Sequence, residues 1–273
     1  MRDFILQIGQ DRDYFREQNY PKENTRKDLT SNKTRDIINT DESPISELKD
    51  ILKFKKRLHS DKKMEKSYRK AIGKRFSNGS EIAKKVFNKF IPPDSVVDSN
   101  YNGTAHYNRN DKKIYMNYSK DLLSLKGTGV TWFHEHGHMI DDLAGKVSTN
   151  EDFHMSLLMD YLEYVKNYKR SNNFTSILDA QEAIGKDLKK SVKSQNAVSD
   201  IMEGLSNGKI KGCAGHMANK PHYWKNSNMI YSETFAHMFE AQFDKVRYKE
   251  MQKYFPNALK KFEELLEGIS NDE

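Results

Sequence analysis

The chain has 273 residues with 31% charged, 36% hydrophobic and 11% aromatic side chains and a formal net charge of +7, which describes a very polar chain that can still bury a core. No apolar run approaches the roughly 20 residues that cross a bilayer, so we expect no membrane span. The single cysteine, Cys213, excludes an internal disulfide, and no secretory signal is recognisable, so we expect a cytoplasmic protein or one that is phage-associated or secreted without such a signal.

The N-terminal part of the chain is polar and rich in helix signals. Its first 45 residues are interrupted by turn-forming segments, and there we expect a loosely ordered arm with one short helix. Apolar residues at helical spacing predict an amphipathic helix from Ser46 to about Lys74. Ser80 is typical of the N-cap of a further helix, which "IPPD" ends because proline cannot continue a helix. We expect residues 1–79 to form a polar, basic helical arm in front of a domain of residues 80–273.

Residues 51–90 hold most of the positive charge. They contain 14 Lys/Arg and three Asp/Glu, a net +11, so the remainder of the chain carries 7 − 11 = −4. Such a segment can contact nucleic acid, but runs of lysine usually solvate exposed helical faces. We therefore expect a solvated face, and nucleic acid is a possible but disfavoured partner.

One small sheet is predicted among many helices. Two short β-like runs, Thr104–Tyr107 and Lys113–Tyr118, flank "NRND", whose Asn and Asp tolerate the geometry of a hairpin turn. This hairpin is either an edge that binds an extended peptide or plain sheet structure. The expected fold class is α+β, mostly α. Further helices are predicted in "VTWFHEHGHMIDD", ending at Gly145, and near 150–168, 174–190, 195–206, 229–244 and 247–268.

The helix "VTWFHEHGHMIDD" carries an unusual density of metal-binding side chains. His134 and His138 are four residues apart and therefore lie on one helical face, where two imidazoles can bind one Zn²⁺ at about 2.0–2.1 Å. Glu135 is one position further round and can take a proton from a water on the metal. This is the H-E-x-x-H pattern of zinc metalloproteases. We expect His136, which points away from the pair, to be structural or solvent-facing.

The same helix has an apolar stripe that includes Phe133, Gly137 and Ile140. Glycine inside a helix costs about 1 kcal/mol relative to alanine, so Gly137 predicts that another element approaches closely behind the metal. On the metal side, Asp141 and Asp142 are near enough to orient a ligand histidine.

A catalytic zinc needs a third protein ligand, and "YSETFAHMFEAQF" is the best source of one. The class of enzymes with a third histidine six residues after the second is excluded, because that position is Ala144. Glu233, His237 and Glu240 share one face of the predicted helix. Helical geometry alone leaves both Glu233 and His237 open as the ligand.

The segments "HEHGHMIDDLAG", "SETFAHMFEA" and "YFPNALKKFEELL" together resemble the catalytic domain of anthrax lethal factor and its relatives, including clostridial Pro-Pro endopeptidases. They resemble more closely the zincin-like domains of minor capsid or head-morphogenesis proteins of phages of Gram-positive bacteria. The resemblance covers residues 80–268. It implies a zincin-like (gluzincin) metallopeptidase fold and a zinc-dependent endopeptidase acting on a peptide or protein substrate. It also implies that Glu233 is the third zinc ligand and His237 a supporting group.

One position departs from that family pattern. Lethal-factor-like enzymes place a tyrosine seven residues before the ligand glutamate, where it supports the oxyanion, and this chain has Asn226 there. Tyr223, Tyr231 and His216 are substitutes without the matching spacing. We expect the donor to the oxyanion to be Tyr223 or His216.

Two other functions are compatible with the sequence. The first is a phage virion structural protein or nucleic-acid-binding protein whose zinc site is vestigial, which the basic segment and the phage resemblance favour. The second is a structural zinc site that includes Cys213 and His216 and has four protein ligands. The structural site leaves Glu135 and Glu233 without roles, so we favour the catalytic one.

Overall fold

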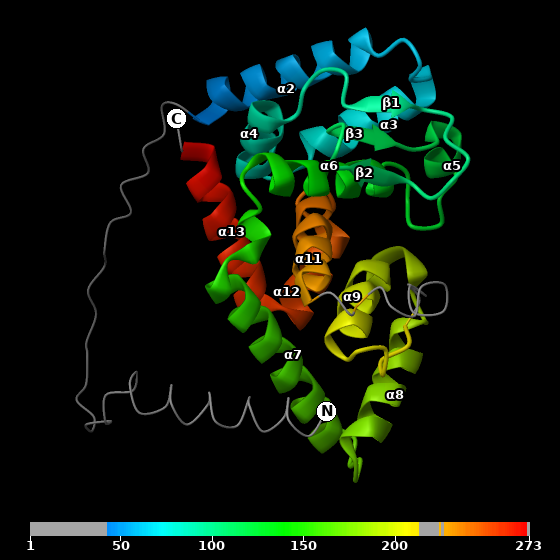
Figure 1. Cartoon of the computed structure of the whole chain (residues 1–273), viewed down its shortest axis with the longest axis vertical. Coiled ribbons are helices and arrows are strands. Elements are labelled where there is room, and N and C mark those ends of the chain that lie inside the picture. Colours follow the sequence, from blue (N-terminus) through cyan, green and yellow to red (C-terminus); the bar gives the residue numbers. More distant parts are fainter. Residues whose placement is uncertain (1–42, 213–223, 225–226, 272–273) are drawn as a thin grey trace, which may run out of the picture. The chain divides into compact units, whose positions relative to one another are not determined.

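The computed structural model describes residues 43–212, 224 and 227–271, which are mostly helical with one three-stranded sheet (Figure 1). This confirms the α+β, mostly α fold class. None of the helices in these ranges is long and apolar enough to cross a membrane. The elements as far as the first metal-motif helix are α2 (Ser43–Ser60), α3 (Lys66–Ser77), α4 (Glu81–Phe90), β1 (Val96–Asp98), β2 (His106–Asn108), β3 (Lys113–Tyr115), α5 (Tyr118–Leu122) and α6 (Val130–Leu143). They are followed by η1 (Val147–Thr149), α7 (Glu151–Ser171), α8 (Ile177–Leu188), α9 (Val192–Leu205), α11 (Ser227–Ala241), α12 (Lys245–Tyr254) and α13 (Pro256–Asn271).

The sheet has the strand order β1-β3-β2, so β2 lies at an edge. The predicted hairpin is confirmed: β2 pairs antiparallel with β3, and Tyr107 lies opposite Ile114. In the turn, Asn108 and Asp111 accept backbone N–H bonds, while Lys112 takes the left-handed conformation with φ 57°. The sequence did not predict β1, which pairs parallel with β3 and has a largely exposed pattern.

The helices α6 and α11 cross at very close range because Gly137 has no side chain. A Cβ atom at this position would lie 2.8 Å from the Cα of Ala236, closer than packed atoms approach. The predicted role of Gly137 is therefore confirmed. The close crossing places the histidine face of α6 directly beside the glutamate face of α11, and both helices are visible at the centre of Figure 1.

The basic helices α2 and α3 belong to the same core as the rest of the described chain. Phe54 of α2 stacks on Phe76 of α3 with ring centroids 3.6 Å apart, and both pack on Phe87 of α4. Phe54 also contacts Trp132 of α6 edge to face. The boundary expected at residue 79 stays a prediction, and residues 1–42, in which an arm with one short helix was predicted, lie outside the described residues.

Two predicted helices are each divided in two in the structure. The helix expected from Ser46 to Lys74 is interrupted at Asp61, whose carboxylate accepts bonds from Lys63 N and the Tyr118 hydroxyl. The last helix, expected at 247–268, is interrupted before Pro256. Buried Asp160 of α7 accepts bonds from the two backbone N–H groups that follow this proline and thereby caps α13.

Candidate metal centre

A cleft of about 830 Å³ opens between α6, α11, β2 and the loop that joins α5 to α6. His134, Glu135 and His138 reach it from α6, and Glu233 and His237 reach it from α11. The side chain of Glu233 is 7% exposed and those of the two α6 histidines are each 14% exposed. These groups are nearly buried but can still be reached from the cleft.

Three ligand-type atoms converge at one point of this cleft. The Nε2 atoms of His134 and His138 lie 3.2 Å apart. Oε2 of Glu233 lies 3.3 Å from the first and 3.5 Å from the second. Ligands at about 2.0–2.1 Å from a tetrahedral zinc are separated from one another by about 3.3 Å. The triangle of donors therefore has the dimensions of one face of a zinc tetrahedron and leaves the fourth vertex to the cleft.

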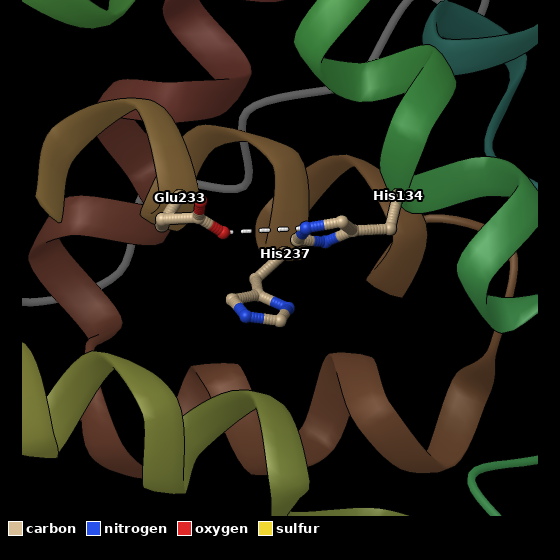
Figure 2. A group of neighbouring side chains, drawn as sticks. All are labelled: His134, Glu233 and His237. Atoms are coloured by element: carbon tan, nitrogen blue, oxygen red, sulfur yellow. Dashed lines mark ion pairs between the residues drawn. The ribbon is translucent and has the colours of Figure 1, made fainter. Parts of the chain in front are cut away.

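A second donor combination overlaps with the first. His134, Glu233 and His237 offer ligand atoms within 4.8 Å of one another (Figure 2). This set is wider than the triangle, and the Nε2 of His237 already lies 3.0 Å from a carboxylate oxygen of Asp200. The set with His138 is therefore the tighter group of donors, and His237 lies beside it with its ring centroid 4.4 Å from that of His134.

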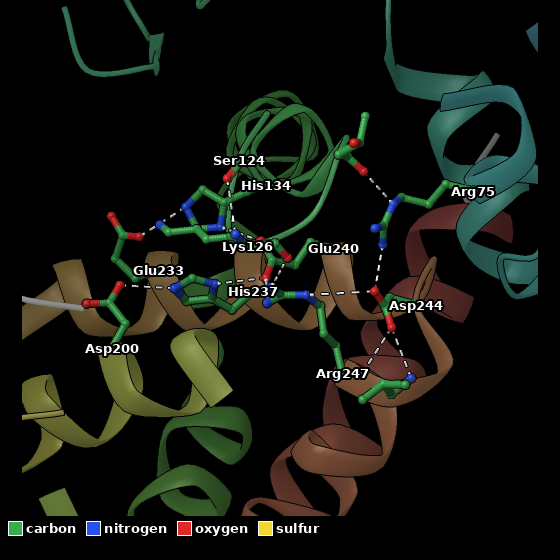
Figure 3. Close-up of polar contacts among 12 residues, drawn as sticks. Arg75, Ser124, Lys126, His134, Asp200, Glu233, His237, Glu240, Asp244 and Arg247 are labelled. Carbon is green, nitrogen blue, oxygen red and sulfur yellow. Dashed lines mark hydrogen bonds and ion pairs between the residues drawn. The ribbon is translucent and has the colours of Figure 1, made fainter. Parts of the chain in front are cut away.

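A buried ion-pair network supports His134 from behind (Figure 3). Glu240 Oε2 lies 3.3 Å from the Nδ1 of His134, and Glu240 Oε1 accepts a 2.9 Å hydrogen bond from Arg247. Glu240 and Arg247 are 2% and 1% exposed. His237 lies between Glu240 and Asp200 and links α11 to α9. A carboxylate behind a ligand histidine fixes its ring orientation and raises its basicity.

His138 has its own support. Its Nδ1 lies 3.3 Å from the hydroxyl of Ser232, which is 3.4 Å from a carboxylate oxygen of Asp141. Asp141 is fully buried and also accepts bonds from the backbone and hydroxyl of Ser148. Asp141 thus reaches the ligand histidine through a serine, whereas Asp142 is bound to the Tyr107 hydroxyl and Lys112 and plays no part in this support.

Glu135 is separate from the donor triangle. Its Oε2 accepts a 2.9 Å hydrogen bond from the backbone N–H of Tyr107 in β2, and the residue is 6% exposed. Because this N–H points away from β3, Tyr107 and Ile114 form a non-hydrogen-bonded pair, and the Tyr107 carbonyl also faces the free edge of the sheet. The edge strand and Glu135 are therefore joined at the cleft.

The carboxylates and imidazoles of the site shift one another's pKa values against the effect of burial. Burial opposes the charge of Glu233, but the imidazoles of His138 and His134 outweigh it and hold the pKa of this carboxyl well below its usual value. Burial likewise opposes the charge of Glu240, while His237 and Arg247 hold its pKa well below normal. Burial disfavours a charged His134, yet Glu233 and Glu240 raise the pKa of this imidazole well above its usual value.

His136 is structural and not solvent-facing. It is fully buried, and its ring packs on Trp132 with centroids 3.9 Å apart. Its Nδ1 donates to the Trp132 carbonyl at 2.6 Å, and its Nε2 lies 2.9 Å from the Ser95 hydroxyl. Burial lowers the pKa of His136 to about 3, so the ring is neutral.

None of the residues expected to support an oxyanion is found in the cleft among the described residues. Tyr231 stacks on His154 with ring centroids 3.3 Å apart and does not line the cleft. Tyr223, His216 and Cys213 lie outside the described residues. The roles of Tyr223 and His216, and a zinc site built on Cys213, stay predictions.

Several supporting residues were not predicted from sequence. Glu240 was placed on the correct face of its helix without a role, and Arg247, Ser232 and Tyr107 received none. Ser232 directly precedes Glu233, a position from which a hydroxyl can reach a neighbouring helix, but this is no distinctive signal. Arg247 and Tyr107 lie on separate elements, and only the tertiary structure connects them to the site.

Comparison with known proteins gives one match. Residues 38–125 match a family described as a domain of unknown function, DUF4806. This segment ends before α6, so it includes the edge strand β2 and none of the donor triangle. No curated protein and no solved structure matches the chain.

Proposed function

We propose that the chain is a zinc-dependent endopeptidase with a zincin-like fold, in which His134, His138 and Glu233 hold the metal. The observation that carries the proposal is the donor triangle, with sides of 3.2, 3.3 and 3.5 Å. The resemblance of the two metal motifs to lethal-factor-like and phage zincin-like domains supports it. A closed structural site has four protein ligands, whereas this triangle faces a cleft with its fourth vertex.

Zinc bound at the triangle would act as a Lewis acid on a peptide carbonyl and lower the pKa of an attacking water toward about 7. Glu135 is the general base in this proposal. It is not one of the three donors, so its carboxylate is available to accept a proton and return it to the leaving amine. In the absence of substrate, the N–H of Tyr107 holds one Glu135 oxygen at the edge strand.

The free edge of β2 supports a peptide substrate. Tyr107 presents its N–H and its carbonyl on the side away from β3, and the strand lines the cleft beside Glu135. An extended peptide that pairs with this edge would run along the donor triangle. In that complex the Tyr107 N–H would exchange its bond to Glu135 for one to the substrate, which would release the base for proton transfer.

The basic helices give little support to the alternative of a nucleic-acid-binding protein. Many of their cations already bind backbone carbonyls, as Lys53 does with Asn88, Lys63 with Val97 and Arg69 with Asp61 and Met64. Arg75 binds Thr128 and Asp244, and Lys84 binds Glu47 and Glu81. These groups hold the fold together.

Two isosteric variants test the proposal. Glu135→Gln removes a proton carrier without removing a ligand, so zinc content should stay near one per chain while peptide hydrolysis falls by about 10²–10⁴-fold. Glu233→Gln removes a ligand, so zinc content should fall and added zinc should partly restore hydrolysis. The measurements are metal analysis and digestion of a broad peptide library. Wild type that is fully loaded with zinc and cleaves no peptide would overturn the proposal.

A further inference from the structure

The charged side chains that line the cleft divide sharply by sign. Its five acidic residues are all buried, with exposures of 2–6%. Its Lys and Arg side chains, in contrast, are all exposed to solvent. The acidic residues are Asp121, Glu135, Asp200, Glu233 and Glu240, and the basic ones are Arg109, Lys120 and Lys126.

Each cleft carboxylate is already engaged. Asp121 accepts bonds from the Tyr68 hydroxyl and the Gly129 N–H, and Glu135 accepts one from Tyr107. The other three lie against the histidines and Arg247 of the metal centre. A ligand that enters the cleft therefore meets few acidic groups that it can approach.

The cations, by contrast, have donors left for a ligand. Lys120 uses one N–H on the Asn102 carbonyl, and one guanidinium nitrogen of Arg109 binds the Ser232 hydroxyl. The ammonium of Lys126 forms no ion pair with any residue in the described ranges. Lys120 and Lys126 stand on the α5–α6 side of the cleft, and Arg109 stands at the end of β2.

The loop that joins α5 to α6 also displays two leucines to solvent, next in sequence to the lining residues Ser124 and Lys126 and not themselves part of the cleft lining. Leu123 and Leu125 are 81% and 83% exposed, more than any other large apolar side chain in the described ranges. They lie between Lys120 and Lys126 in the loop that joins α5 to α6. Exposed leucines beside a cleft are unfavourable in water and are typical of a surface that another molecule covers.

This loop is held firmly from below. Arg247 donates to the Lys126 carbonyl at 2.8 Å, and Arg75 donates to the Thr128 carbonyl at 3.0 Å. The Thr128 hydroxyl closes the loop on the Leu122 carbonyl at 2.8 Å. The leucines are therefore presented by a fixed backbone, and Arg247, which also supports Glu240, ties this rim to the metal centre.

We propose that this rim, formed by Lys120, Leu123, Leu125 and Lys126 and extended by Arg109, docks an acidic peptide segment with apolar side chains next to its acidic ones. The inference rests on the proposed function in taking the cleft as a peptide site. It adds the substrate class: the carboxylates of the peptide meet the three exposed cations, and its apolar side chains cover the two leucines. Charge complementarity selects the partner, since basic peptides meet only like charge at the rim.

The test measures binding without hydrolysis. Zinc-loaded Glu135→Gln protein is titrated into two fluorescent peptides, one with Asp, Glu and Leu residues and one in which Asn and Gln replace the acids. The acidic peptide should bind about tenfold tighter at low ionic strength, and the difference should shrink at physiological salt. Adding Lys120→Glu and Lys126→Glu should abolish or invert the preference.

Two further variants separate docking from general charge. Lys166→Glu with Lys189→Glu makes the same change in net charge at exposed sites on α7 and after α8, and should leave the preference intact. Leu123→Ser with Leu125→Ser should weaken the binding of both peptides severalfold and leave the ratio of the two affinities unchanged. Because all four rim side chains are exposed, the variants should keep the wild-type melting temperature.

Equal affinity for the two peptides would overturn the inference, as would equal effects of the rim and control charge reversals. Leucine-dependent binding to phosphatidylserine vesicles without peptide binding would also overturn it and identify the rim as a membrane surface. The outcome is separable from that of the proposed function. Selective binding of the acidic peptide by a protein that hydrolyses no peptide would contradict only the proposed peptidase function. Hydrolysis without a preference for acidic peptides would contradict only the proposed docking rim.

Discussion

His134 and His136 stand two residues apart on α6 and have opposite environments. His136 faces an aromatic layer of Trp132 and Phe87, makes two hydrogen bonds to neutral groups and is neutral, with its pKa lowered to about 3 by burial. His134 faces α11, where Glu233 and Glu240 raise the pKa of its ring well above normal against the effect of burial. One helix thus buries one histidine as a neutral core residue and holds another between two carboxylates.

The neighbours of each histidine decide its role. On the aromatic side, a hydroxyl and a carbonyl satisfy both ring nitrogens, so nothing further can bind. On the α11 side, each ring presents one nitrogen to a shared point and has its other nitrogen supported by Glu240 or Ser232. Variants at Glu240 and Ser232 would disturb the second side and leave the first intact.

The largest effect is expected from Gly137→Ala. Its Cβ would meet the Cα of Ala236 at 2.8 Å, and because backbone cannot yield, α6 and α11 must separate. We expect the free energy of unfolding to fall by about 1–3 kcal/mol and zinc affinity to fall with it, because the donors sit on different helices. Denaturant titration with and without zinc checks this.

Gly268→Ala is the matched control for Gly137→Ala. Gly268 is also within a helix, α13, but nothing lies within 4 Å of an added Cβ there. Alanine should be neutral or stabilise by up to about 1 kcal/mol. An equal fall in the free energy of unfolding for both variants would contradict the explanation that Gly137 is needed for the close contact of α6 with α11.

Glu240→Gln should come next in size. The change keeps the shape of the side chain but removes the charge that faces Nδ1 of His134 and pairs with Arg247. We expect zinc affinity to fall by about 10–100-fold with the donor triangle otherwise intact. Competition with a chromogenic chelator measures this, with exposed Glu267→Gln as the control. Unchanged zinc affinity would show that Glu240 serves the fold alone.

Ser232→Ala should have a smaller effect on the same side of α6. The variant removes a neutral hydroxyl that contacts His138, Asp141 and Arg109, and each neutral hydrogen bond is worth about 0.5–1.5 kcal/mol. Zinc affinity should therefore fall less than in Glu240→Gln, by about tenfold at most. The same chelator assay compares the zinc affinities of the two variants. A larger loss in Ser232→Ala than in Glu240→Gln would contradict the view that the charged partner of a histidine matters more than the neutral one.

The smallest effect is expected in the basic helices. Replacement of exposed Lys55, Lys56, Lys66 and Lys70 by glutamine should leave zinc content and peptide cleavage unchanged. DNA binding by wild type should be weak and nearly absent at physiological salt, where true phosphate contacts give a slope of log K against log salt of about −0.9 per contact. Sub-micromolar binding that these replacements abolish would make the segment a nucleic-acid surface.

Local pattern was sufficient for some features of the molecule. The H-E-x-x-H helix, its close contact at Gly137 and the β2–β3 hairpin follow from spacing and turn chemistry within short windows. Spacing could not choose between Glu233 and His237, because both share a face of α11. The structure distinguishes them through distant parts of the chain: Glu233 lies against both α6 histidines, while Asp200 of α9 engages His237.

Other features depend on partners far away in sequence. Tyr118 and Asp160 bond to Asp61 and to the N–H groups after Pro256 from 57 and 97 residues away, whereas Pro256 itself is a local signal that ends a helix. The sequence of α2 and α3 predicts a basic arm because their surfaces are rich in lysine. In the structure, Phe54 and Phe76 of these helices pack into the common core. Local periodicity carries no information about such distant contacts.

The central claim, that His134, His138 and Glu233 form the metal site, is tested most directly by locating the metal. Crystals of the zinc-loaded protein, measured on both sides of the zinc absorption edge, would give an anomalous difference map. We predict one strong peak at about 2.0–2.1 Å from His134 Nε2, His138 Nε2 and a Glu233 oxygen. A peak bound by His237 without His138, a peak among Cys213 and His216, or a loaded protein with no peak at the triangle would contradict it.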